Sequence, residues 1–230
     1  MRILGIDSST PKGSVALLDN SNLLKEAALP DGTTYSNCLL TTVDQILLET
    51  GLKFGDIDAF AVTTGPGSFT GLRVGVSLAK GFVLSSHKPF TGVSSMEALA
   101  YTVESANYPV CTLLDARKKQ VYSAKFSVSG GVVKRLEEDS VVTAQELCDS
   151  ISEPTQFIGI NPYEDYFAER LGSQYIPTTQ YRFQTAAAGA AMFAYHRPLS
   201  EMETDLDKFS IQYIRRPEAE INILKQTSKN

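Results

Sequence analysis

The order of predicted secondary-structure elements occurs twice along the chain, and this duplication limits the available folds more than any single motif does. In the first half, period-two alternation and turn residues predict three strands, after which the chain continues as helix, strand, helix, strand and helix. The same order follows, more weakly, after Pro109. The elements expected in the first half cover residues 3–7, 14–18, 23–29, 35–50, 59–63, 70–86 and 90–93, followed by a helix opened by the capping pair Ser94 and Glu97. Those expected in the second half cover 110–114, 121–128, 132–136, a helix opened by Thr143 and Glu146, 157–160, 163–171, 175–176 and 185–195.

Such a duplication implies two similar α/β lobes, residues 1–106 and 107–230, that face one another across a cleft. The order of elements resembles the superfold shared by actin, the ATPase domain of Hsp70 and the sugar kinases, known as ASKHA. A shared fold does not establish a shared activity, so the function has to be inferred from individual sites.

Composition restricts the location and partners of the protein. The chain has 230 residues, 43% of them hydrophobic, which is enough to bury a core. It contains no stretch of about 18 apolar residues and no basic leader, so we expect a cytoplasmic protein without membrane contact. The formal net charge of −5 opposes binding of nucleic acid by the chain alone. Two small basic spots, at 117–119 and at Arg215 with Arg216, are either phosphate contacts or ordinary solvated surface.

The turn after the first strand is the first candidate site. In nucleotide-using members of the superfold, this turn carries an acid that holds hydrated Mg²⁺ and a glycine that lets the backbone approach phosphate. Here the acid and hydroxyl residues are present and the glycine is missing. Two interpretations stay open: a weak metal-nucleotide or partner site, or an aspartate that caps a strand turn through its own backbone. The candidate cleft, with its counterpart in the second copy, comprises Asp7, Ser8, Ser9, Thr10, Gly67, Ser68, Asp115 and Arg117.

A glycine-rich segment at residues 65–73, GPGSFTGLR, lacks the lysine of a Walker loop and the glycine spacing of a dinucleotide site. It opens a helix in which Gly71, Gly75 and Ala79 recur every fourth residue, although an interior glycine costs about 1 kcal/mol. Close approach of another helix would offset this cost. That helix is either the one at 35–50 of the same chain or a helix pair from another subunit. A second apolar row, Leu72, Val76 and Val83, is expected to face the sheet and to leave the glycine row for an external contact.

Hydrolytic and metal chemistry find little support. The two histidines, His87 and His196, each stand beside a lysine or arginine and far in sequence from any acid or cysteine cluster, so we expect both at the surface. No nucleophile elbow of the Gly-x-Ser-x-Gly type is present. The sequence therefore assigns neither a metal site nor a catalytic residue.

Five segments closely resemble the bacterial TsaB family, also called YeaZ. They are residues 3–10 (ILGIDSST), 64–80 (TGPGSFTGLRVGVSLAK), 92–100 (GVSSMEALA), 113–122 (LLDARKKQVY) and 213–219 (YIRRPEA). The resemblance implies a non-catalytic scaffold or activator subunit of tRNA threonylcarbamoyladenosine synthesis. It also implies a degenerate copy of the catalytic paralogue TsaD, without the metal-binding histidine pair of that enzyme. The family docks on TsaD through two helices, here 35–50 and 70–86, and the ATPase TsaE joins the assembly, so tRNA would be contacted only through the complex.

The docking surface carried over from this resemblance comprises Leu39, Val43, Ile46, Gly71, Leu72, Gly75 and Ala79. No cofactor is expected in the chain itself, and ATP with Mg²⁺ would bind only at an interface shared with the partner. Family members commonly begin the first docking helix with histidine, serine and an acid, whereas this chain has Tyr35, Ser36 and Asn37. Any role of that histidine or acid is therefore not carried over. Without its partner, the chain is expected to form a homodimer through the same helices.

Two other functions compete with this one. The first is a stand-alone ATP-dependent small-molecule kinase that uses Asp7 and Asp115 around Mg²⁺. The second and weaker one is a peptidase, for which no set of serine, histidine and acid can be assembled from the sequence.

Overall fold

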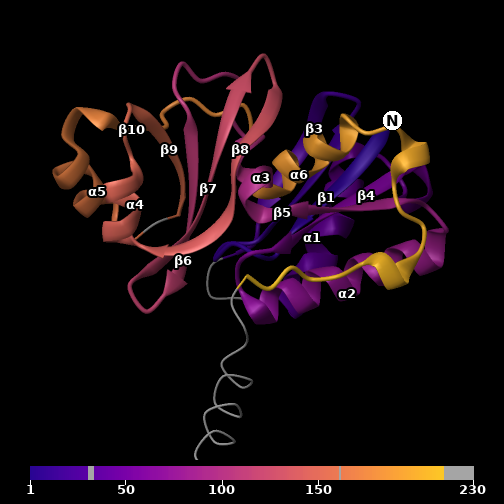
Figure 1. The fold of residues 1–230 in the computed structure, drawn as a ribbon. Coiled ribbons are helices and arrows are strands. Elements are labelled where there is room, and N and C mark those ends of the chain that lie inside the picture. Colours follow the sequence, from indigo (N-terminus) through magenta and orange to yellow (C-terminus); the bar gives the residue numbers. More distant parts are fainter. Residues whose placement is uncertain (31–33, 161, 215–230) are drawn as a thin grey trace, which may run out of the picture.

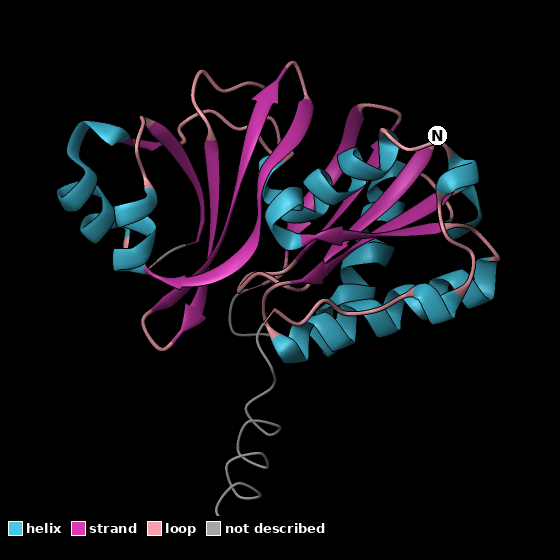
Figure 2. Cartoon of the chain, in the orientation of Figure 1, coloured by secondary structure: helices cyan, strands magenta, loops and turns pink. Residues whose placement is uncertain are grey.

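The computed structural model describes residues 1–30, 34–160 and 162–214. It consists of two five-stranded sheets, each with helices against it, as Figure 1 and Figure 2 show. The basic pair Arg215 and Arg216 and the end of the family-like segment at 213–219 lie outside the described residues. Within the described ranges, no helix is long and apolar enough to cross a membrane.

Lobe 1 is built on a sheet with the strand order β3-β2-β1-β4-β5. The first three strands pair antiparallel, whereas β4 and β5 run parallel to β1. Helices α1 and α2 cover one face of this sheet, and α3 and α6 lie against the other (Figure 1). Its elements are β1 (Arg2–Asp7), β2 (Ser14–Asp19), β3 (Asn22–Ala28), α1 (Tyr35–Thr50), β4 (Ala59–Gly65), α2 (Phe69–Ser86), β5 (Phe90–Ser94) and α3 (Ser95–Ala100).

Lobe 2 has the strand order β10-β9-β6-β7-β8. Its strands β8, β7, β6, β9 and β10 correspond to β3, β2, β1, β4 and β5 of lobe 1, so the two sheets have the same order. Helices α4 and α5 pack on its outer face around a separate small core. Its elements are β6 (Val110–Arg117), β7 (Gln120–Ser129), β8 (Val132–Thr143), α4 (Ala144–Ser150), β9 (Thr155–Ile160), α5 (Glu164–Leu171) and β10 (Tyr175–Pro177), and α6 (Ala186–Tyr195) follows them in the chain.

Local sequence signals account for most helix boundaries. The Ser68 hydroxyl accepts a hydrogen bond from the Gly71 amide at the start of α2, and Ser94 does the same for the amides that open α3. Thr143 and Glu146 form the predicted reciprocal capping box at the start of α4. Helix α1 ends at Gly51, whose φ of 70° is the left-handed conformation that glycine adopts without strain.

The expected extent of the second lobe, 107–230, needs a correction at its C-terminal side. Helix α6 is buried on nearly all sides and packs on the sheet of lobe 1, against β1, β2 and β4. The described chain after α6 also returns to lobe 1. The Phe209 ring stacks on the Phe90 ring with their centroids 4.1 Å apart, and the Gln212 amide donates to the Thr64 carbonyl. A helix without a polar face gives no sequence signal of the sheet that it covers.

The two lobes share one hydrophobic core. This cluster joins side chains of the lobe 1 sheet, such as Ile3 and Ala16, to side chains of the lobe 2 sheet, such as Val110 and Phe126, through α3 and α6. Helix α3 lies between the sheets in Figure 1. Because the apolar surface of each lobe is buried against the other, separating the lobes would expose it to water.

A polar network crosses the same boundary. Arg135 of β8 forms an ion pair with Asp139 at 2.5 Å and reaches Glu97 of α3 at 3.4 Å. The Ser94 hydroxyl at the start of α3 donates to Asp139 at 2.5 Å. Burial raises the pKa of Glu97, and this effect outweighs the opposing pull of the Arg135 guanidinium. The network therefore ties lobe 2 to α3 with charged groups that are mostly withdrawn from water.

Candidate functional site

The turn after β1 is a closed hydrogen-bonded unit centred on Asp7, whose side chain is completely buried. One carboxylate oxygen accepts hydrogen bonds from the Ser9 amide at 3.0 Å, the Ser9 hydroxyl at 2.6 Å and the Thr63 hydroxyl at 2.8 Å. The other accepts from the Thr10 hydroxyl. Protein donors thus occupy both oxygens, and this is how a carboxylate is stabilised when it is removed from water. Of the two interpretations of this turn, the geometry favours the cap.

Helix α2 covers this turn with its glycine row. A methyl group built on Gly71 would overlap the Ser8 carbonyl, and one built on Gly75 would overlap the Ser8 hydroxyl. A methyl group built on Gly67 would overlap the Ser9 carbonyl, and the Ser68 amide donates to the Ser9 carbonyl at 2.9 Å. Because these glycines have no side chain, α2 can pack directly on the β1–β2 turn of the same chain. Both Ser8 and Ser9 are sealed from solvent by this contact.

Tyr35, at the start of α1, closes the unit from the other side and was missed by sequence reasoning as a structural residue. Its hydroxyl donates to the Thr10 carbonyl at 2.7 Å, and its ring lies against Gly13 and Gly71. Burial, together with the nearby Asp7 carboxylate, raises the pKa of Tyr35. The replacement of the family histidine by tyrosine was visible in the sequence, but nothing there indicated a contact with a turn 25 residues earlier in the chain.

The residues predicted to form the docking surface are buried in the chain's own core, and the assignment of these side chains to a surface is wrong. Glycine and apolar rows of α2 both face inward, the first toward the β1–β2 turn and the second toward the sheet. The reason is that the spacing of small residues indicates that another segment packs closely on this face of the helix, but it does not identify that segment. The buried side chains and glycines are Leu39, Val43, Ile46, Gly71, Leu72, Gly75 and Ala79.

The outer face of α1 and α2 consists of other residues. Leu40, Leu48 and Leu84 are large apolar side chains with 49%, 81% and 63% of their surface exposed. Helices α1 and α2 contact each other. They meet at Tyr35 and Gly71, and Leu48 and Leu84 lie the same number of residues beyond that contact. Gly81 precedes Leu84 by three residues on α2, and a methyl group added there would meet no atom of the described residues within 4 Å.

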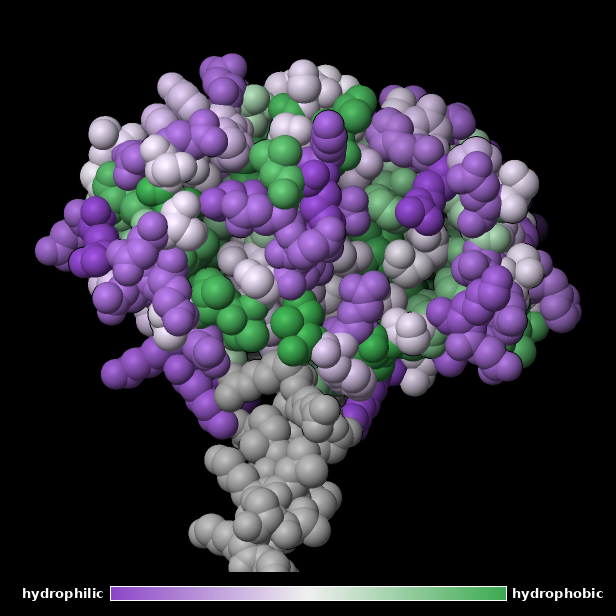
Figure 3. All heavy atoms as spheres, in the orientation of Figure 1, coloured by the Kyte–Doolittle hydropathy of each residue, from purple (hydrophilic) through white to green (hydrophobic). Residues whose placement is uncertain are grey.

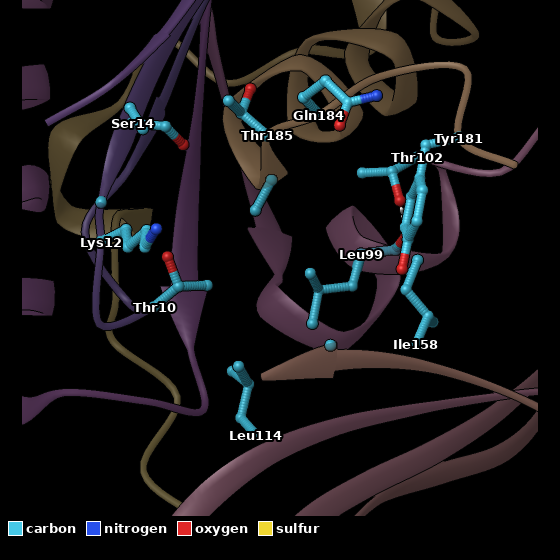
Figure 4. Close-up of a pocket in the computed structure, with 14 residues that line it drawn as sticks. Thr10, Lys12, Ser14, Leu99, Thr102, Leu114, Ile158, Tyr181, Gln184 and Thr185 are labelled. Carbon is cyan, nitrogen blue, oxygen red and sulfur yellow. Dashed lines mark hydrogen bonds between the residues drawn. The ribbon is translucent and has the colours of Figure 1, made fainter. Parts of the chain in front are cut away.

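A cavity of about 230 Å³ opens between the lobes (Figure 4). Thr10, Lys12 and Ser14 of the β1–β2 hairpin line one side, and Leu99, Thr102, Ile158 and Tyr181 line the other. Several of its hydroxyls are committed to protein partners: Thr185 donates to Glu26 at 2.6 Å, and Thr102 donates to the Leu99 carbonyl at 2.7 Å. Of the eight residues predicted to form a nucleotide or anion cleft, Thr10 lines this cavity.

The other predicted cleft residues divide between two places. Asp7, Ser8, Ser9, Gly67 and Ser68 are brought together, but in the sealed unit beneath α2 rather than at an open site. Asp115 and Arg117 stand at the exposed end of β6, where the Asp115 carboxylate accepts a hydrogen bond from the Arg117 amide at 2.8 Å. Asp7 is therefore buried and Asp115 exposed, and neither is among the residues that line the cavity between the lobes.

Metal ligation has no site among the residues that the structure describes, because no group of three or more histidine, cysteine, aspartate and glutamate side chains comes together there. His87 and His196 are exposed, as expected. The first ends α2 and the second ends α6, where it packs beside Tyr101 and Tyr195.

Comparison with known proteins places this geometry in a family. A family model described as TsaD, tRNA N6-adenosine threonylcarbamoyltransferase, matches residues 32–194. The tRNA threonylcarbamoyladenosine biosynthesis protein TsaB of Bacillus subtilis is 30% identical over 69% of this chain and 71% of its own length. TsaB of Escherichia coli is 34% identical over 64% of each chain. The solved structure of YeaZ from Pseudomonas aeruginosa superposes with a TM-score of 0.71 at 23% identity and covers 92% of this chain and 99% of its own.

The two matching sheets and the helices between them define a two-lobed protein of the actin-like superfold. The turn after its first strand is closed by hydrogen bonds to the Asp7 carboxylate and covered by α2. The chain belongs to the TsaB family. Membership in this family and the closed turn do not favour the kinase and peptidase alternatives.

Proposed function

We propose that this chain is a non-catalytic subunit of tRNA threonylcarbamoyladenosine synthesis that docks onto a TsaD-type threonylcarbamoyltransferase and supports its transfer reaction. The family assignment supports the process, since the curated relatives are named for it. The assembly would operate in the cytoplasm, with a TsaE-type ATPase as a further member and with tRNA reached through the complex.

The observation that carries the non-catalytic role is the closed unit around Asp7. A carboxylate that holds hydrated Mg²⁺ must offer lone pairs to the water ligands. Here four protein donors take them, and α2 lies directly on Ser8 and Ser9, where phosphate would have to approach. Opening the site would require α2 to leave its sheet, against the hydrophobic contacts of Val76 and Ala79.

We further propose that docking uses the exposed face of α1 and α2, in place of the buried residues carried over from the family. Gly81 is central to this assignment, because an interior helix glycine costs about 1 kcal/mol relative to alanine and no described residue occupies the space of an added methyl group. Close approach of a partner helix would explain it. Leu84, three residues further along α2, and Leu48 of α1 are exposed apolar side chains that can anchor such an interface.

Reconstitution tests the proposal. Partner enzyme, ATPase, tRNA, threonine, bicarbonate and ATP are combined with and without this chain, and modified tRNA is counted. We expect product only, or far faster, with the chain present, and Asp7→Ala in a variant that remains folded should retain activity in the complex. Equal rates with and without the chain would refute the activator role, and ATP turnover by the isolated chain that Asp7→Ala abolishes would revive the kinase.

Docking is tested separately with Leu84→Glu and a matched control. Val132, on β8 of the other lobe, is exposed to nearly the same extent, 62% against 63%, so Val132→Glu introduces the same charge at a comparable surface position. Leu84→Glu should weaken partner binding at least tenfold, because it buries a carboxylate in an apolar contact. Normal binding by Leu84→Glu, or equal weakening by both variants, would show that the contact lies elsewhere.

A further inference from the structure

The turn between β6 and β7 has an unusual backbone for its residues. Arg117 pairs with Gln120 across the hairpin, so that Lys118 and Lys119 alone form the connection. Their φ angles are 52° and 61°, and Arg117 has a φ of 60°. Three consecutive non-glycine residues thus adopt the left-handed conformation, which places the Cβ atom of an L-residue too close to a carbonyl oxygen.

A two-residue hairpin with positive φ at both central positions is a type I′ turn, for which asparagine and glycine are strongly preferred. The next hairpin of the same sheet shows this preference. Ser129 pairs with Val132, and the two connecting residues are Gly130 and Gly131, with φ angles of 56° and 77°. A methyl group on Gly130 would meet no atom of the described chain within 4 Å, so glycine is used there for its backbone freedom. The chain therefore has glycine at both central positions of one type I′ turn and lysine at both central positions of the neighbouring one.

Strain of this kind is retained where another requirement favours the residues. The three residues are exposed at the end of a hairpin that projects from the lower edge of lobe 2 in Figure 1, and Figure 3 shows hydrophilic side chains projecting at that corner. Asp115 is the neighbouring acid, and its carboxylate is used to hold the Arg117 amide at 2.8 Å. The backbone thus presents a guanidinium and two ammonium groups in a fixed turn.

We propose that the β6–β7 turn, Arg117, Lys118 and Lys119, is a contact site for the phosphate backbone of RNA. The inference rests on the proposed function, in which the complex holds tRNA. A chain with 26 acidic and 21 basic residues has a net negative charge that opposes the approach of polyphosphate, so a projecting cationic turn is a favourable place for an RNA strand to approach. Lysine and arginine recognise phosphate through charge and hydrogen bonds without reading sequence, so the contact positions the RNA and does not select it.

The test measures binding of fluorescently labelled, unmodified tRNA to the assembled complex over a range of salt concentrations. Lys118→Gln with Lys119→Gln removes two charges, and we expect affinity at low salt to fall about tenfold and the slope of log affinity against log salt to decrease by about 2. Lys53→Gln with Lys134→Gln is the control, because it changes the net charge equally at two exposed positions away from the turn. The control should bind like the unchanged complex.

A second variant tests the strain argument and guards against misfolding. Lys118→Asn with Lys119→Gly supplies the preferred turn residues, and should raise the melting temperature by about 2–4 °C while losing RNA affinity to the same degree. Unchanged RNA binding in both turn variants, or loss of affinity for the protein partner in place of RNA, would overturn the proposal, as would an unchanged melting temperature. Failure of the unchanged chain to associate with the enzyme would instead refute the proposed function.

Discussion

Replacement by alanine should have opposite effects on stability at two glycines of helix α2, Gly75 and Gly81. Gly75 lies on the buried row against Ser8, whereas Gly81 faces open space on the same helix. Alanine favours a helix over glycine by about 1 kcal/mol at either position. At Gly75 the new methyl group also overlaps the Ser8 hydroxyl, and overpacking of this kind costs about 1–3 kcal/mol. The difference between the two variants isolates the packing cost, because the helix propensity gain is common to both.

The overlap predicted for Gly75→Ala is with the Ser8 hydroxyl, so it can be tested by removing that hydroxyl. Its hydroxyl is buried and has no hydrogen-bond partner among the described residues, so Ser8→Ala should be close to neutral on its own. In the Ser8→Ala background the nearest side-chain atom to a methyl group on Gly75 is the Cβ of residue 8, at 3.1 Å, so most of the overlap disappears. Gly75→Ala and Ser8→Ala should therefore be strongly non-additive. Gly71→Ala should show no such rescue, because its neighbour is the Ser8 backbone carbonyl.

Urea denaturation and thermal melting of the single and double variants provide the measurement. For a chain of this size we expect Gly75→Ala to melt about 2–12 °C below Gly81→Ala, and the gap to shrink when Ser8→Ala is added. Equal stability of Gly75→Ala and Gly81→Ala would refute the claim that the glycine row serves packing within the chain. An unchanged gap in the Ser8→Ala background would show that the strain arises elsewhere.

Three further predictions follow from exposure and ionisation. The raised pKa of Glu97 means that the folded protein holds this proton more tightly than the unfolded chain, so its stability contribution is present below the ordinary carboxyl pKa of 4.5 and is lost as the pH rises through the folded value. Glu97→Gln should flatten that decline in denaturation measured at several pH values, and an unaltered slope would contradict the assignment. Burial raises the pKa of Cys111 to about 12, so a thiol reagent at neutral pH should modify the half-buried Cys38 and spare Cys111 until the protein unfolds. Light scattering should find a homodimer of the isolated chain that Leu84→Glu converts to a monomer, and a monomer at high concentration for the unchanged chain would count against a sticky α1 and α2 face.

The sequence predicted local structure well because local signals determine it. The helix at 35–50 and its end at Gly51 follow from apolar spacing and a glycine cap, and the structure has both. The capping pair Thr143 and Glu146 likewise marks the start of α4. The order of strands and helices, read twice, was enough to indicate the superfold.

Questions that depend on tertiary partners were beyond the sequence. The spacing of Gly71 and Gly75 revealed a close approach and could not show that the approaching group is the turn at Ser8 of the same chain. The apolar composition of α6 predicted burial and left open which sheet it covers. Asp7 and Asp115 occupy matching positions in the two copies, yet one is saturated by hydroxyl and amide donors and the other is exposed. The duplication preserved topology without preserving the chemistry of the two turns.

Site-specific photo-crosslinking tests the docking account most directly. A photoreactive amino acid is introduced in place of Leu84 on the outer face of α2, or in place of Val132 on β8 as the control, and the chain is irradiated together with the threonylcarbamoyltransferase. The account predicts a covalent adduct with the enzyme from position 84 and none from position 132. An adduct from position 132 with none from position 84 would contradict it.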